Sequence, residues 1–139
     1  MNPPPSPCLD TICQQIALGR QLAQRLAKAL RGRAVLEVEF RLLWLLSRQA
    51  ARRIEQRSLA QQLGVSPAQV SSVVDKLRRQ QFIESIPDET DRRRQHWQLT
   101  RSGQQQFQAI VAEVQPLLEA APGQDSNASR LPPSQAEAA

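Results

Sequence analysis

The sequence predicts a mainly helical protein with one small antiparallel β-hairpin close to its last helix. Apolar residues recur three and four positions apart through most of the chain. After residue 81 this period stops, and two short apolar runs flank a charged turn, as in a hairpin. The length of 139 residues favours a single domain.

The first predicted helix carries an apolar seam with alternating steps of four and three residues: Ile12, Ile16, Gly19, Ala23, Leu26 and Leu30. We expect Asp10 or Thr11 to cap its start and Gly32 to end it. Gly19 costs this helix about 1 kcal/mol relative to Ala. It is either a point of close approach by a neighbouring helix or simply tolerated.

The next helices come in quick succession. A second helix over residues 36–49 has Val38, Leu42, Leu45 and Leu46 on one face, which Leu43 and Trp44 widen, so Trp44 is expected in the core. A third, over residues 56–63, ends at Gly64, which suits a left-handed cap. Ser66 then caps a fourth helix, with Pro67 at its first position.

Residues 82–86 and 96–99 are predicted strands, separated by a charged turn over residues 87–95. Thr100 is expected to cap the last helix, whose inner side carries Phe107, Ile110, Val111 and Val114. Pro116 should kink or break that helix, with a final turn through Leu118. The apolar surface on the seam of the first helix and on the inner face of the last helix is larger than the core of one chain needs. A two-fold dimer built from these helices is therefore predicted.

Two helices joined by a tight turn and followed at once by a charged hairpin make a winged helix-turn-helix. The second helix of the pair offers its N-terminal end to the DNA major groove, where short side chains allow a close approach. The candidate contacts there are Ser66, Pro67, Ala68, Gln69, Ser71 and Ser72, with Lys76 and Arg79 placed for phosphates.

The hairpin tip supplies Arg92, Arg93 and Arg94 directly after Asp91, which is suited to hold one of them. Narrow minor grooves attract Arg through their concentrated negative potential. The alternative is a solvated hairpin whose charges serve solubility. As a whole, the winged helix could instead dock a protein partner or a structured RNA. A docking surface would expose large apolar residues, and the recognition face carries Gln, Ser, Lys and Arg.

The charge distribution favours a polyanionic partner. The formal net charge is +5, with sixteen Arg and two Lys. Residues 20–57 hold ten basic and three acidic residues, a net of +7. The sequence has no apolar run long enough for a membrane span and no secretory signal, so a cytoplasmic protein is expected.

The sequence predicts neither an enzyme nor a metal or cofactor site. It has no Gly-rich phosphate loop and no nucleophile elbow. His96, Cys8 and Cys13 are its only His and Cys residues, too scattered for a metal site. The two thiols are expected to be reduced and to have no switching role.

Residues 36–118 resemble the MarR family of bacterial transcription regulators. The resemblance lies in EFRLLWLL (39–46), SLAQQLGVSPAQVSSVVDKL (58–77), FIES (82–85) and DETDRRRQHWQLTRSG (88–103). The family's wing pattern falls on Asp91, Arg93, Leu99, Thr100 and Gly103. The resemblance implies a homodimer that reads a pseudo-palindromic operator, with repression that small ligands or oxidants relieve in many members.

The chain departs from the family pattern in three places. Gln81 stands where members usually have Gly before the first wing strand, and Ser85 stands where they usually have Arg. A non-Gly residue in a left-handed position costs about 1 kcal/mol. Members also usually end in a longer helical pair that joins the dimer.

We therefore expect a disordered N-terminus (1–8), a single domain (9–120) and a disordered tail (121–139). Within the domain, residues 9–35 and 101–120 would form the dimerisation helices and residues 36–100 the DNA-binding lobe. The expected partners are double-stranded DNA and a second copy of the chain. A small-molecule effector of unknown identity could bind between the first two helices, the last helix and the DNA-binding lobe.

Overall fold

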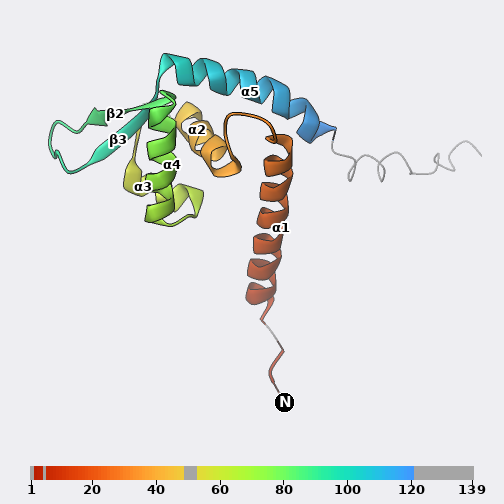
Figure 1. The fold of residues 1–139 in the computed structure, drawn as a ribbon. Helices are drawn as coiled ribbons and strands as arrows, with labels where there is room; N and C mark the ends of the chain where they lie inside the picture. Colours follow the sequence, from red (N-terminus) through yellow and green to blue (C-terminus); the bar gives the residue numbers. More distant parts are fainter. Residues whose placement is uncertain (1, 5, 49–52, 121–139) are drawn as a thin grey trace, which may run out of the picture.

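The computed structural model describes residues 2–4, 6–48 and 53–120, which form five helices and three strands (Figure 1). In chain order these are α1 (Pro7–Ala29), α2 (Glu37–Arg48), β1 (Arg53–Glu55), α3 (Gln56–Leu63), α4 (Pro67–Arg79), β2 (Ile83–Pro87), β3 (Gln95–Leu99) and α5 (Arg101–Glu119). The expected tail, residues 121–139, lies outside the described residues. No helix within the described ranges is long and apolar enough to cross a membrane.

The core gathers the apolar faces of α2, α3, α4 and α5 with one face of the sheet. Its most deeply buried side chains include Leu42, Leu43, Leu46, Leu59, Val70, Leu77 and Val114. Each helix contributes residues three or four positions apart, because that spacing returns to the same side of a helix. The helical periods in the sequence thus correspond to the observed core, and this packing positions α4 against α2 and α3.

The sheet has three antiparallel strands in the order β1–β3–β2. Trp97 in β3 lies opposite Ile54 in β1, and both are buried. Strands β2 and β3 form the predicted hairpin, with Ile83 opposite Leu99. Strand β1 was not predicted from the sequence, because three residues are too few to show a period of two.

Helix α1 begins earlier than predicted. Ser6 is the N-cap and its hydroxyl accepts a hydrogen bond from Leu9 N (3.3 Å), with Pro7 in the first turn. The expected caps Asp10 and Thr11 are therefore wrong, and Pro7 and Cys8, expected to be disordered, are helical. The same Ser-Pro pair that starts α4 also starts α1, and it satisfies a free N–H in the same way.

The expectation that Trp44 belongs to the core is wrong, since 45% of the residue is exposed. The buried stripe of α2 runs through Glu39, Leu42, Leu43 and Leu46. At about 100° per residue, position 44 falls well away from that stripe. The Trp44 ring instead lies 5.1 Å from the guanidinium carbon of Arg48.

Pro116 does not end α5, which continues to Glu119. Proline removes one backbone donor, and both Pro116 and Ala112, which would accept that bond, are exposed, so water can satisfy the freed carbonyl. The predicted cap at the other end is confirmed: Gly103 N donates to Thr100 Oγ1 (2.8 Å). Thr100 N also donates to Phe82 O (3.0 Å), which joins the start of α5 to the base of the hairpin.

Candidate nucleic-acid interface

The turn between α3 and α4 presents the start of α4 to solvent. Gly64 adopts the predicted left-handed conformation (φ 68°), and Ser66 accepts a hydrogen bond from Gln69 N (3.1 Å) as the predicted N-cap. Val70 and Val74 hold the helix on the core. The residues of its first turns predicted to meet DNA are all exposed: Ser66, Pro67, Ala68, Gln69, Ser71 and Ser72.

The two cations predicted for phosphates further along α4 already have acidic partners. Lys76 Nζ lies 2.7 Å from Oε1 of Glu39, a buried residue of α2. Arg79 Nη2 lies 2.8 Å from Asp75 Oδ2. The hydrogen bond from Arg78, together with the charge of Arg79, lowers the pKa of Asp75, so this carboxylate stays ionised on the recognition helix.

The wing turn is held by carboxylates that accept backbone N–H bonds. Arg93 N donates to Asp91 Oδ1 (2.9 Å), and Thr90 N donates to Asp88 Oδ1 (2.9 Å). The Thr90 bonds lower the pKa of Asp88. All three wing arginines, Arg92 to Arg94, are exposed. The role expected of Asp91 thus includes fixing the backbone of Arg93.

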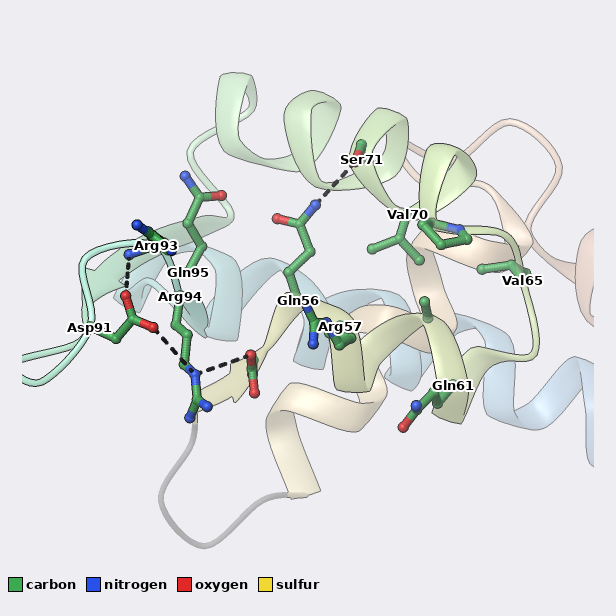
Figure 2. A pocket seen from close by; sticks show the side chains of 13 residues that line it. Gln56, Arg57, Gln61, Val65, Val70, Ser71, Asp91, Arg93, Arg94 and Gln95 are labelled. Carbon is green, nitrogen blue, oxygen red and sulfur yellow. Dashed lines mark hydrogen bonds and ion pairs between the residues drawn. The ribbon is translucent and has the colours of Figure 1, made fainter.

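Arg94 is drawn toward the body of the protein. Its Nε lies 3.9 Å from Asp91 Oδ2 and 4.0 Å from Glu55 Oε1, at the end of β1 (Figure 2). Within the described part of the chain, the guanidinium groups of Arg92 and Arg93 form no ion pair. Of the three wing arginines, these two are the ones left to meet an external anion.

A hollow of about 770 Å³ opens between α3, α4 and the wing. Among the predicted contacts, it is lined by Pro67, Ser71, Arg93 and Arg94 (Figure 2). The other predicted residues lie elsewhere on α4 or the wing: Ser66, Ala68, Gln69, Ser72, Lys76, Arg79 and Arg92. The fold therefore brings the flank of the recognition helix and the wing to one recess.

The residues of this hollow that sequence reasoning missed include Gln56 and Arg57, at the start of α3. Gln56 Oε1 accepts from Trp97 Nε1 (3.0 Å), and Gln56 Nε2 donates to Ser71 Oγ (3.1 Å). One amide thus joins β3 to α4. No spacing in the sequence signals this, since its partners are 41 and 15 positions away.

A second, mostly apolar recess of about 370 Å³ lies between α1, α2 and α5. It is lined by Leu22, Arg25, Leu26, Phe40, Arg41, Trp44 and Leu118. Its volume falls within the range of small-molecule sites. Among the described residues, no cluster of His, Cys, Asp or Glu has the arrangement of a metal site.

Comparison with known proteins gives a family match over part of the chain and a fold for most of it. Residues 37–94 match the model of the MarR family. No curated protein sequence matches the chain. Among solved structures, wild-type MarR from E. coli in its apo form is 21% identical, with a TM-score of 0.68 over 84% of this chain and 88% of that one.

Two further similar structures contain DNA. A mutant MarR from E. coli complexed with operator DNA is 21% identical, with a TM-score of 0.65 over 86% of this chain and 87% of that one. Sco3205, a MarR family transcriptional regulator from Streptomyces coelicolor in complex with DNA, is also 21% identical. Its TM-score is 0.66 over 99% of this chain and 84% of that one.

Proposed function

We propose that this chain, whose residues 37–94 match the MarR family of winged-helix, DNA-binding transcriptional regulators, is a repressor that binds a pseudo-palindromic operator as a homodimer. The family consists of regulators rather than enzymes. A dimer seated on an operator excludes other proteins from the same DNA, which is the physical basis of repression. Two-fold symmetry in the protein implies two-fold symmetry in the site that it reads.

The observation that carries the dimer is the apolar surface of α1. Only the end of this helix is buried against its own chain, at Ala29 and Leu30, and the helix projects from the rest of the molecule (Figure 1). The exposed apolar residues along its free part are Leu9, Ile12, Ile16, Leu18 and Leu22. Large apolar residues exposed in this number along one helix favour burial against a second copy. Residues 9–35 and 101–120 are proposed as the dimerisation helices.

The DNA-binding lobe is proposed as residues 36–100. Gln69 and Ser72 would meet base edges in the major groove, with Ser66, Pro67, Ala68 and Ser71 beside them. Arg92, Arg93 and Arg94 would enter or border the minor groove. Lys76 and Arg79 would share their charge between their acidic partners and the phosphates.

The exposed residues of this lobe favour DNA over a protein partner. Within the described ranges, the large exposed apolar side chains lie on α1, α2, α5 and at Leu36. None lies on α3, α4 or the wing, where a protein-docking surface would need them. A polar, Arg-rich surface suits a phosphate backbone.

An effector site is proposed in the apolar recess between α1, α2 and α5. Trp44 and Phe40 offer aromatic surface there. Two cations also line it: Arg25, which donates to Leu118 O (3.2 Å), and Arg41, which is ion-paired with Glu37. A small aromatic acid fits this combination of groups. Titration of Trp44 fluorescence with salicylate tests it, with Trp44→Phe as the control that separates the signal from Trp97.

The function is tested by selection of DNA from a random-sequence library, followed by measurement of the mass of the complex. The expected result is an enriched motif with two inverted half-sites, bound by two protein chains. Light scattering of the free protein at tens of micromolar should give a dimer. A monomer in solution, bound as one chain per site, would exclude the proposed assembly. If no sequence is enriched, the DNA-binding proposal itself fails.

A further inference from the structure

We propose that the hollow between α3, α4 and the wing seats a phosphodiester of the DNA backbone, to which Ser71 donates its hydroxyl proton in a direction set by Gln56 and Trp97. The inference rests on the proposed DNA-binding function and assigns one contact within it. Gln56 is the positioning residue of this site, because it acts on DNA only through Ser71.

The direction of the hydrogen bonds follows from Trp97. An indole N–H only donates, and Trp97 is 4% exposed, so its nitrogen requires an acceptor inside the protein. That acceptor is Gln56 Oε1 at 3.0 Å. The opposite orientation of the amide would place two donors against each other. The orientation of Gln56 is therefore fixed, with its nitrogen toward α4 (Figure 2).

The next bond is fixed in turn. The amide nitrogen of Gln56 can only donate, so Ser71 Oγ, 3.1 Å away, must accept. This leaves the hydroxyl proton of Ser71 unused. The hydroxyl of Ser47 in α2 differs, since it donates to the carbonyl of Trp44 in its own helix (2.6 Å). Among the described residues, the Ser71 proton has no such acceptor, and its side chain lines the hollow.

The place of the hollow identifies the acceptor that would fill it. With α4 in a major groove and the wing in the adjacent minor groove, the sugar-phosphate strand that separates the two grooves passes between them. The hollow is the space between these two elements. Phosphate oxygens only accept hydrogen bonds, and hydroxyl side chains are among their usual donors.

The charges around the hollow are consistent with a phosphate. Its lining includes the cations Arg57, Arg93 and Arg94 and the carboxylates of Glu55 and Asp91. Arg94 lies 4.0 Å from the first carboxylate and 3.9 Å from the second, and so offsets part of their charge. Within the described residues, the side chains of Arg57 and Arg93 form no ion pair and are available to the phosphate.

The first experiment uses the duplex selected by the wild-type protein, with each phosphate replaced in turn by an uncharged methylphosphonate. Ser71→Ala should weaken binding to the unmodified duplex by about three- to tenfold, the usual value of one hydrogen bond. At one phosphate per half-site, the penalty of the methylphosphonate should be smaller for Ser71→Ala than for the wild type by that same factor. Ser102→Ala, on the exposed side of α5, is the matched control and should behave like the wild type.

A second set of duplexes carries 7-deazapurines, which remove a base acceptor and leave the phosphates intact. Ser71→Ala should lose the same factor on these duplexes as on the unmodified one. If the effect of Ser71→Ala instead disappears with one deazapurine and with no methylphosphonate, Ser71 reads a base and the proposed phosphate contact is wrong.

A charge variant tests the role of Gln56. In Gln56→Glu both side-chain oxygens accept, so Trp97 keeps its partner while Ser71 turns its proton inward. Gln61→Glu places the same charge in the lining of the same hollow and serves as the control. Gln56→Glu should bind the unmodified duplex about three- to tenfold more weakly than Gln61→Glu. Adding Ser71→Ala to it should cost nothing further.

The outcomes separate this inference from the proposed function. If the wild type enriches a motif but Ser71→Ala binds it equally well, the phosphate contact is overturned and DNA binding stands. If Gln56→Glu and Gln61→Glu lose affinity equally, the positioning role of Gln56 is overturned. Alanine favours a helix, and the carboxylate of Gln56→Glu stands at a helix start, whereas that of Gln61→Glu stands in the last turn of α3. Thermal unfolding of every variant checks that each is folded.

Discussion

Lys76 Nζ lies 2.7 Å from Oε1 of Glu39, and this ion pair fastens the recognition helix α4 to the start of α2. Glu39 is only 3% exposed, and its second oxygen accepts a hydrogen bond from Leu36 N (2.8 Å). The carboxylate therefore closes the first turn of α2 and holds α4 at the same time. A buried charge of this kind depends on its partner.

Lys76→Met should lower the free energy of unfolding by about 1–3 kcal/mol, because it leaves the Glu39 carboxylate buried without its partner. Arg79→Met is the control, since it removes a cation from an exposed pair on the same helix, and its effect should be about 0–1 kcal/mol. Urea unfolding at one protein concentration measures both. Equal free energies of unfolding for the two variants would show that the Lys76–Glu39 ion pair does not contribute to stability.

Gly103→Ala should destabilise the fold by about 1–3 kcal/mol or more. A Cβ at this position would lie 1.9 Å from Phe82 O, which belongs to backbone and cannot rotate away. Gly19→Ala is the helical control, because nothing in its own chain lies within 4 Å of a Cβ there. That control should raise stability by about 0.5–1 kcal/mol. Thermal unfolding of both variants checks the contrast, and a neutral Gly103→Ala would contradict the close approach.

Gln81→Gly should stabilise the protein by about 1 kcal/mol. Gln81 has φ 62° and is the one non-glycine residue with positive φ among the described residues, so it carries the strain that glycine avoids. Its carbonyl, which accepts from Thr100 Oγ1 (2.6 Å), is kept in the variant. Gln80→Gly, at φ −75°, should lose stability instead. Chemical denaturation of the pair decides whether the left-handed position is strained.

Arg93→Ala and Gln69→Ala should differ in kind. Arg93→Ala should weaken binding to most operators and reduce the slope of log affinity against log salt by about 1. Gln69→Ala should relax the preference at particular bases, by about 1–3 kcal/mol if the contact is bidentate. Affinities over an operator library at several salt concentrations separate the two. If both variants bind DNA like the wild type, the winged helix is not a DNA reader and a protein-docking role is favoured.

Replacing Cys8 and Cys13 together by Ser should leave DNA binding and its response to peroxide unchanged. Both thiols are free and exposed on α1. Neither the hollow nor the apolar recess includes them in its lining. Band-shift titrations with and without peroxide compare the two proteins. Loss of an oxidant response in the double variant would make these cysteines the sensor.

The sequence predicted the elements whose residues repeat over several turns. Helix α3 matches its predicted bounds, and Ser66, Gly64 and Thr100 act as predicted because a cap is a local interaction. Trp44 was misplaced because it was predicted to widen the apolar face of α2, whereas its angle on the helix places it well away from the buried stripe. Of the kink or break predicted at Pro116, the break does not occur, because an exposed helix can satisfy one free carbonyl with water.

The candidate site was predictable only in part for a related reason. Gln69 and Arg93 follow from the position of a motif along the chain. Gln56 follows from no local pattern, because its role depends on the meeting of β3 with α4 in space. The pairing of Lys76 with Glu39 is likewise a contact across the core, between positions 37 apart in sequence.

Strand β1 has only three residues, yet it runs directly into α3 and pairs with β3 along its length. Strand β1 thereby joins the wing and the pair of helices α3 and α4 into one rigid unit. The distance between α4 and the wing is then set by contacts within the chain. Such a rigid unit has little freedom to change the distance between α4 and the wing when the local shape of the DNA changes. Accommodation of operators with different half-site separations would then fall to the hinge where α1 and α5 leave the lobe.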